Sequence, residues 1–199
     1  MELGCVVMAA GSSSRFGANK LMQALNGIPL YRRALEAVPA DFPRVHVVTG
    51  YQAVAELARE MGFVVIQNDR PELGISRTIH LGLEGLADCC GVLFMTADQP
   101  LLTAKTLMRL AAAFRTVPEA IIAAAHNGQR GNPCLFPRAL FPELLNLEGD
   151  VGGGKVIAAH RDRLRLVEVP EWELADCDTA QALRELEHRS LGWLGSLYY

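Results

Sequence analysis

The chain has 199 residues, of which 50% are hydrophobic and 21% are charged, and its formal net charge at pH 7 is −3. A chain of this size suits one domain with a sizeable core, and the composition is that of a globular protein rather than a disordered or fibrous one. The charge balance and the lack of a Lys/Arg cluster argue against a nucleic-acid partner. No apolar run approaches the roughly 18 residues that a membrane span needs, so we expect no membrane association.

The first residues, MELGCVVMAAG, lack the basic segment of a secretory signal peptide, and their apolar run is too short for one. The five cysteines form no CxxC pair, and an odd number cannot all pair within the chain. This usage is typical of free thiols in a reducing compartment. We therefore expect a cytoplasmic protein.

Short apolar runs alternate with amphipathic stretches along the first part of the chain. The runs are apolar nearly throughout, as in strands covered on both faces, and predict strands over 3–9, 45–49, 63–67, 92–96 and 120–125. Between them, apolar residues recur at three- and four-residue steps, which predicts helices over 29–38, 52–61, 76–86 and 103–114. Thr103 is placed to cap the last of these helices.

This alternation predicts an α/β fold: a single three-layer, Rossmann-like domain over residues 1–199 with a mostly parallel sheet. Ligands bind such sheets outside the carboxyl ends of the strands. The chemistry is therefore expected in the segments that follow strands, namely 10–20, 49–52, 67–76 and 97–100. The alternation breaks after about residue 126, and we interpret 127–178 as an elaboration over the mouth of the sheet.

The stretch VVMAAGSSSRFGANK, residues 6–20, leads from the first expected strand into a loop of small and polar residues. Its spacing from Gly11 fails the Walker A pattern, and Ser13 stands where the dinucleotide fingerprint needs its second glycine. Small residues let backbone N–H groups close around an anion, and Arg15 and Lys20 add positive charge. We predict a phosphate-binding loop, with a generic glycine/serine connection as the alternative.

The segment AAGSSSRFGANKL resembles the signature of nucleotidyltransferases that move a nucleoside monophosphate from an NTP. Within that superfamily the chain most resembles the molybdenum-cofactor cytidylyltransferases, the MocA-like branch, because Ala10-Gly11 stands where related guanylyltransferases tend to have Gly-Gly. The resemblance implies the fold of the nucleotide-diphospho-sugar transferases. It also implies that Ala9, Ala10 and Gly11 contact the base and ribose, and that Arg15 and Lys20 hold the triphosphate.

Two acidic segments are candidates for a metal site. Asp98, in MTADQP, follows an expected strand; it could cap the next helix, but a carboxylate there also suits Mg²⁺, which binds one or two carboxylates plus phosphate oxygens. The family resembled uses the acid of this segment for Mg²⁺. Its D-x-D-T pattern near the C-terminus puts the second ligand at Asp178, with Asp176 as the fallback. Asp178-Thr179 is equally typical of a helix N-cap.

A glycine and a serine precede the helix expected at 76–86, in NDRPELGISRTIHLGLEGL. The resemblance implies that Gly74 allows close approach to the cytosine ring. Ser76 could bind the base or cap the helix. The alternative is an ordinary loop followed by an ordinary N-cap.

Two further segments resemble the family's acceptor region. In GQRGNPCLF, Asn132 stands where histidine is common, and GDVGGG matches the G-D-x-G piece that follows. The resemblance implies that Arg130, Asn132 and Asp150 face the acceptor, a pterin dithiolene with a terminal phosphate, which the Arg130 fork suits. The glycines at 152–154, where the family commonly has bulkier residues, leave the identity of the acceptor open.

These residues predict an enzyme that transfers CMP from CTP to the terminal phosphate of molybdopterin and releases pyrophosphate. Arg15, Lys20 and Asp98 are the expected catalytic residues, Mg²⁺ the expected cofactor, and a client molybdoenzyme a possible partner. Three alternatives stay open. They are the same chemistry with GTP or with a sugar phosphate, a non-catalytic nucleotide-binding carrier of the cofactor, and, least favoured, a dinucleotide oxidoreductase.

Overall fold

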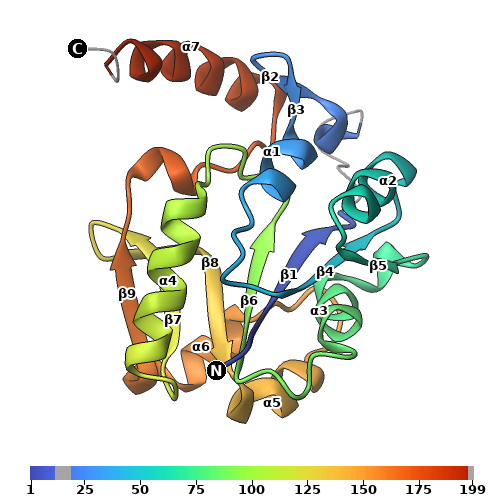
Figure 1. The fold of residues 1–199 in the computed structure, drawn as a ribbon, viewed down its shortest axis with the longest axis vertical. Coiled ribbons are helices and arrows are strands. Elements are labelled where there is room, and N and C mark those ends of the chain that lie inside the picture. Colours follow the sequence, from blue (N-terminus) through green and yellow to red (C-terminus); the bar gives the residue numbers. More distant parts are fainter. Residues whose placement is uncertain (12–18, 197–199) are drawn as a thin grey trace.

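The computed structural model describes residues 1–11 and 19–196, with side chains as far as residue 188. Its centre is a seven-stranded sheet in the order β5-β4-β1-β6-β8-β7-β9 (Figure 1). The predicted α/β fold with a mostly parallel sheet is confirmed: only β8 runs antiparallel to its neighbours. The strands are β1 (Leu3–Ala9), β4 (Arg44–Thr49), β5 (Val64–Gln67), β6 (Gly91–Thr96), β7 (Ile121–His126), β8 (Gln129–Pro137) and β9 (Leu164–Glu168).

The segment 127–178 is not only an elaboration, since it supplies β8 and β9 to the sheet itself. Asn127 and Gly128 both have positive φ, 50° and 74°, and His126 pairs directly with Gln129. This is the two-residue hairpin that Asn-Gly favours, so β8 folds back antiparallel beside β7. The Asn-Gly pair is therefore a local signal for β8, a strand that the alternation of apolar runs does not predict.

Helices cover both faces of the sheet (Figure 1), which confirms the three-layer arrangement. One face carries α1 (Leu30–Glu36), α2 (Gln52–Glu60) and α4 (Ala104–Thr116), and the other carries α3 (Ile75–Leu83), α5 (Phe141–Leu145) and α6 (Gly154–Ala159). The four helices predicted from periodicity are all present. The Thr103 hydroxyl accepts a hydrogen bond from the Thr106 N–H at 3.3 Å, as expected for the cap of α4.

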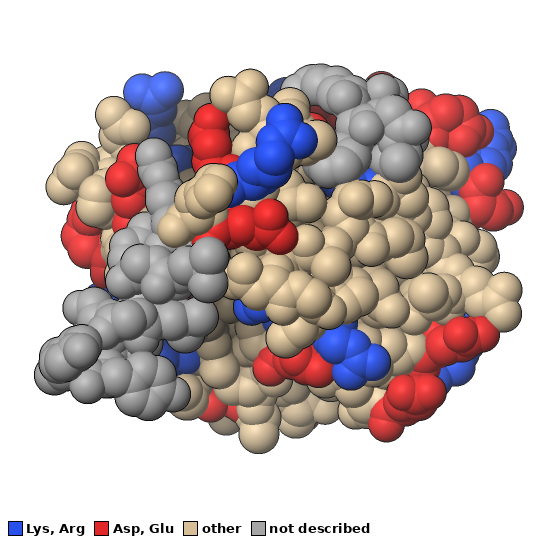
Figure 2. Space-filling model, turned by 90° about the horizontal axis from the view of Figure 1, so that it is seen from above, with Lys and Arg blue, Asp and Glu red and all other residues tan. Residues whose placement is uncertain are grey.

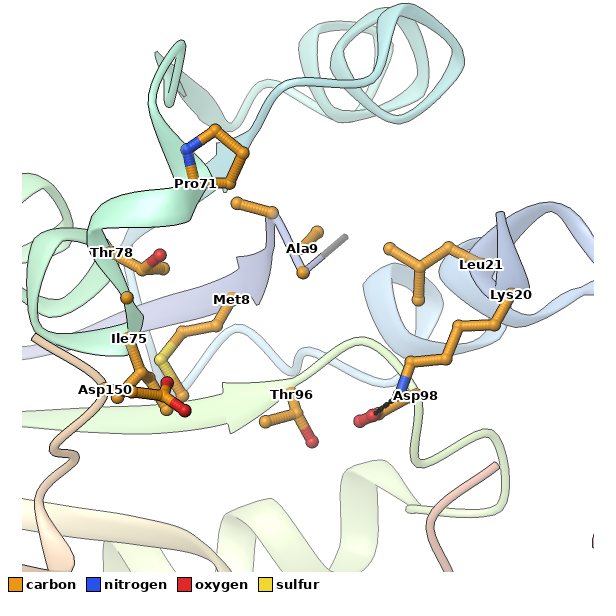
Figure 3. Close-up of a pocket in the computed structure, with 13 residues that line it drawn as sticks. Met8, Ala9, Lys20, Leu21, Pro71, Ile75, Thr78, Thr96, Asp98 and Asp150 are labelled. Atoms are coloured by element: carbon orange, nitrogen blue, oxygen red, sulfur yellow. Dashed lines mark hydrogen bonds and ion pairs between the residues drawn. The ribbon is translucent and has the colours of Figure 1, made fainter. Parts of the chain in front are cut away.

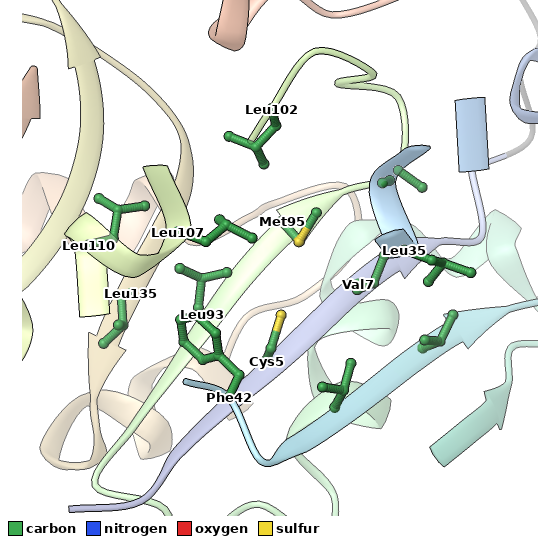
Figure 4. Close-up of a cluster of buried hydrophobic side chains, with 14 of the residues drawn as sticks. Cys5, Val7, Leu35, Phe42, Leu93, Met95, Leu102, Leu107, Leu110 and Leu135 are labelled. Atoms are coloured by element: carbon green, nitrogen blue, oxygen red, sulfur yellow. The ribbon is translucent and has the colours of Figure 1, made fainter. Parts of the chain in front are cut away.

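The core consists of two apolar layers, one on each side of the sheet. Cys5 and Val7 of β1 pack with Leu93 and Met95 of β6 beneath α1, α2 and α4 (Figure 4). The intervening residues of the same strands, such as Val6, pack against the other helices. Because alternate side chains leave a strand on opposite faces, both faces must be apolar, which explains the unbroken hydrophobic runs.

A small hairpin and the last helix form a separate unit above one end of the sheet (Figure 1). The hairpin consists of β2 (Ala24–Leu25) and β3 (Ile28–Pro29), and α7 spans Ala180–Ser196. Leu25, Leu30, Cys177 and Leu186 bury their side chains together between them. This third cluster anchors the chain that leads into α7 over the carboxyl ends of the central strands.

Five single-turn 3-10 helices complete the described chain: η1 (Lys20–Met22), η2 (Pro71–Leu73), η3 (Arg138–Leu140), η4 (Arg161–Arg163) and η5 (Glu171–Leu174). Within the described residues, no helix combines the length and the apolar character needed to cross a bilayer. All five cysteines fall in this part of the chain and carry free thiols, as expected.

Candidate active site

A cavity of about 280 Å³ lies at the carboxyl ends of β1 and β6, where the fold class predicts ligand binding. Figure 3 shows Asp150 and the Lys20–Asp98 pair on opposite sides of it, with Met8, Ala9 and Thr96 between them. Most residues singled out in the sequence line this one cavity: Ala9, Ala10, Gly11, Lys20, Gly74, Asp98 and Asp150. Arg15 lies outside the described residues, so its expected role stays a prediction.

The end of β1 is held by the neighbouring strand. The Thr49 hydroxyl donates to the Ala9 carbonyl at 2.9 Å and accepts from the Tyr51 N–H at 3.0 Å. The Tyr51 hydroxyl in turn donates to the Gly11 carbonyl at 2.7 Å. Ala9 and Ala10 present no more than a methyl group, so a planar ligand can lie against this backbone. The part played by Tyr51 was missed in the sequence, where a tyrosine after a strand carries no signal of its own.

Lys20 joins the two acidic segments. Its ammonium lies 2.5 Å from Oδ2 of Asp98 and 2.7 Å from Oδ1 of Asp178. Burial of the ammonium acts to lower the pKa of Lys20, but the hydrogen bonds to Asp178 and Asp98 outweigh it and raise the pKa above its ordinary value. Lys20 is therefore a fixed positive charge between two carboxylates at physiological pH.

Two oxygen atoms at this point have no hydrogen-bond partner within the described part of the chain: Oδ1 of Asp98 and Oγ1 of Thr96, both buried. An unsatisfied buried carboxylate oxygen is costly unless something binds it. A hard divalent cation fits this donor set. The described residues contain no group of three or more potential metal ligands, so such an ion would depend on ligand oxygens as well, which is usual for Mg²⁺.

Between the two candidate acids near the C-terminus, Asp178 is the one that contacts Lys20. The helix N-cap expected at Asp178-Thr179 is present and is supplied by Thr179, whose hydroxyl accepts from the Ala182 N–H at 3.0 Å at the start of α7. Asp176 faces a different cavity, which it shares with Arg130. Desolvation, together with the charges of Asp98 and Asp178, raises the pKa of Asp176 to about 6.

Gly74 lines the cavity, but its backbone explains why glycine is needed. It has a φ of +90°, and an added Cβ would lie 2.4 Å from the carbonyl carbon of Gly149. The space that a side chain at position 74 would need is thus occupied by the backbone of the loop that carries Asp150. Contact between Gly74 and a base stays a prediction. The expected cap is wrong: Gly74 is the N-cap of α3, while Ser76 is 4% exposed and its N–H donates to the Gly149 carbonyl at 3.2 Å.

A second cavity of about 190 Å³ adjoins the first, since Met8 and Ile75 line both. Arg130 and Asn132 line it together with the glycines at 152–154, whereas Asp150 belongs to the first cavity. The remaining walls are largely apolar, and within the described part of the chain the Arg130 guanidinium donates a single long contact of 3.6 Å, to the Cys134 thiol. Arg130 and Asn132 therefore line a cavity that adjoins the one lined by Lys20, Asp98 and Asp150.

Charges on the face seen in Figure 2 are mixed, with basic and acidic side chains scattered among uncharged ones. Neither sign forms a continuous stripe on the described part of this face. A surface that tracks a nucleic-acid backbone needs such a stripe. The view agrees with the absence of a Lys/Arg cluster in the sequence.

The family model of the MobA-like NTP transferase domain matches residues 5–164. The bifunctional protein GlmU of Kineococcus radiotolerans is 35% identical over 119 residues, which are 54% of this chain and 24% of that protein. A probable molybdenum cofactor guanylyltransferase of Nostoc sp. is 26% identical over 193 residues, 94% of this chain and 91% of that protein. The chain thus spans about a quarter of the length of the first relative and most of the second.

Among solved structures, a homolog of Mycobacterium tuberculosis rv0371c from mycobacterium sp. strain JC1 has the same fold. The TM-score is 0.80 at 26% identity, with 96% of this chain and 98% of that chain covered. The structural similarity therefore covers nearly the whole chain.

Proposed function

The chain belongs to the MobA-like NTP transferase domain family, and from this membership we propose that it transfers a nucleoside monophosphate from an NTP to the terminal phosphate of molybdopterin. The observation that carries the proposal is the convergence of Lys20, Asp98 and Asp178, from three distant segments, beside the cavity at the end of β1. Pyrophosphate is the product that leaves.

The chemistry needs no nucleophile from the protein. A phosphate on the acceptor is already ionised at pH 7 and attacks the α-phosphorus in line, so the protein contributes position and charge. In the proposed complex the small residues at 9–11 lie against the base and ribose. Lys20 and Arg15 pair with the phosphates that depart, and Arg130 holds the phosphate of the acceptor.

Asp98 and Asp178 would hold Mg²⁺, which supplies neutralisation of the negative charge that develops on the α-phosphate. The buried, unpartnered Oδ1 of Asp98 supports this assignment. Lys20, which bridges the two carboxylates, would turn to the phosphates of the bound triphosphate.

For the nucleotide we propose CTP, on the basis of Ala10-Gly11 at the start of the loop. GTP is the second candidate. It is favoured by relatives named as probable molybdenum cofactor guanylyltransferases, one of which matches 94% of this chain. The two differ only in which base the cavity accepts and share every other feature of the proposal.

The experiment is a pyrophosphate-release assay with CTP, GTP, ATP and UTP, each with and without molybdopterin. We expect release with CTP only when molybdopterin is present. Turnover with GTP and molybdopterin, but not with CTP and molybdopterin, would replace the cytidylyl proposal by the guanylyl one. Nucleotide binding without turnover in any combination would favour a non-catalytic carrier.

The metal assignment is tested with the variant Asp98→Asn. We expect it to lower turnover by on the order of 100-fold or more, as loss of a charge-stabilising group does in other enzymes. Its thermal denaturation and circular dichroism should stay close to wild type. Asp162→Asn, an exposed acid in η4, should leave turnover unchanged. Full activity in Asp98→Asn would refute the metal assignment.

A further inference from the structure

The chain that leads into α7 runs beside the loop that follows β6, and hydrogen bonds fasten the two together. The side-chain amide of Gln99 donates to the Leu174 carbonyl at 3.2 Å. The Cys177 N–H donates to the Asp98 carbonyl at 2.9 Å. The backbone that carries one proposed metal ligand is thus tied directly to the residue preceding the other.

A third fastening comes from a buried carboxylate. Glu173 is only 5% exposed, and its Oε2 accepts from both the N–H and the hydroxyl of Thr103, at 3.0 and 2.9 Å. The same hydroxyl accepts from the Thr106 N–H and so caps α4. Burying a carboxylate is costly, but two donors and the positive end of α4 offset that cost. The Glu173 carboxylate is therefore held in one position by Thr103 at the start of α4.

The side chain of the proposed metal ligand Asp178 makes few contacts within the described part of the chain. Its side chain is 52% exposed, and among the described residues its ion-pair partner is Lys20 at 2.7 Å. The residue before it, Cys177, is fully buried against Leu25 and Leu30. The position of the Asp178 carboxylate is consequently determined by how firmly the preceding backbone is held.

We propose that Glu173 is a positioning residue of the metal site: through Thr103 it holds the chain leading into α7 so that the Asp178 carboxylate faces Asp98. The inference rests on the proposed function, because it takes Asp98 and Asp178 as the metal ligands. Glu173 is absent from the lining of the nucleotide cavity, so its influence on a metal passes through the backbone.

The test compares Glu173→Ala and Glu173→Gln with wild type in two measurements that need no turnover. Amide exchange of Cys177, followed by NMR without metal, should be about tenfold faster in Glu173→Ala, the equivalent of one lost charge-assisted hydrogen bond. The affinity of the nucleotide-free protein for Mn²⁺, followed by EPR, should fall by about tenfold, as for other residues that orient metal ligands. Glu173→Gln keeps an acceptor oxygen and should stay near wild type in both.

A double-mutant cycle separates positioning from a general structural effect. In the Asp178→Asn background, Glu173→Ala should change Mn²⁺ affinity by less than about twofold, because the ligand it positions is gone. Thr103→Val, which removes the hydroxyl and keeps the N–H donor to Glu173, should show part of the effect of Glu173→Ala, and Thr103→Ser should show none. Glu171→Ala, an exposed acid in the same turn, is the matched control and should behave as wild type.

Unchanged Mn²⁺ affinity in a folded Glu173→Ala protein would overturn the proposal. An undiminished effect in the Asp178→Asn background would overturn it equally. These results are distinct from failure of the proposed function, which would appear as no pyrophosphate release by wild type with any nucleotide while exchange and Mn²⁺ binding still responded to Glu173.

Discussion

The Lys20 ammonium and the Asp98 carboxylate are 78 residues apart in the chain and 2.5 Å apart in the structure. The same ammonium contacts Asp178, so a cation of the protein itself stands between the two proposed metal ligands. A divalent cation held by these carboxylates would lie close to the Lys20 ammonium, and because like charges repel, each cation weakens the binding of the other. Lys20 therefore neutralises part of the negative charge of Asp98 and Asp178.

Replacing this lysine should separate its two effects. In Lys20→Met, the affinity of the nucleotide-free protein for Mn²⁺ should rise, because the competing cation is gone. Pyrophosphate release should fall by on the order of 100-fold, because the departing phosphates lose a positive partner. EPR titration and the release assay measure the two quantities. Lys155→Met, an exposed lysine in α6, should change neither; weaker Mn²⁺ binding in Lys20→Met would contradict the competition.

Gly74→Ala should destabilise the protein by more than its backbone angle alone explains. The φ of +90° disfavours any side chain, and the new Cβ would also meet the Gly149 backbone at 2.4 Å. We expect the free energy of unfolding to fall by about 2 kcal/mol or more. Gly128→Ala is the matched control, since its φ is +74° with no atom within 4 Å of the added Cβ among the described residues. Urea denaturation that gave equal losses for both would show that the Gly74–Gly149 contact contributes nothing.

Arg130→Ala should weaken binding of the acceptor and leave binding of the nucleotide unchanged. The guanidinium lines the second cavity, and its hydrogen-bond partner among the described residues is the Cys134 thiol rather than a carboxylate. Loss of one phosphate contact should raise KM for molybdopterin by about tenfold and leave KM for the NTP unchanged. Steady-state kinetics with each substrate varied in turn measures this, with Arg161→Ala as an exposed control. A rise confined to the NTP would place Arg130 on the nucleotide instead.

His46 should make stability depend on pH. It is 6% exposed, and its Nδ1 contacts the Gly82 carbonyl at 2.9 Å. Burial lowers the pKa of His46, and the charge of Arg44 lowers it further against the effect of that hydrogen bond. The unfolded chain, with an ordinary pKa of about 6.5, then binds more protons than the folded one below neutrality.

The sign follows directly. The free energy of unfolding should decrease as pH falls from about 6.5 towards the lowered folded pKa, and this contribution should level off below it. Urea denaturation at a series of pH values should show the decrease in wild type and less of it in His46→Gln. His188→Gln, at an exposed position of α7, should leave the profile unchanged. A profile identical in wild type and His46→Gln would contradict the assignment.

Local signals account for five strands of the central sheet and for the four helices α1 to α4. The apolar runs and the helical periodicity each needed only neighbouring residues, and Thr103 as a cap is a matter of three residues. The same kind of signal existed for β8 in Asn127-Gly128. The alternation of strands and helices does not predict β8, because this strand follows β7 through a hairpin and lies antiparallel between β6 and β7.

The sequence by itself determined the α/β class, the ends of strands as the place for chemistry, and most of the residues that line the cavity. Only the tertiary structure decided that Lys20 stands between Asp98 and Asp178, that Gly74 accommodates the Gly149 backbone, and that Glu173 reaches Thr103. Strand and helix preferences arise from nearest neighbours along the chain. Contacts between residues 70 or more positions apart arise only when the packed sheet brings its strand ends together, and local preferences carry no information about them.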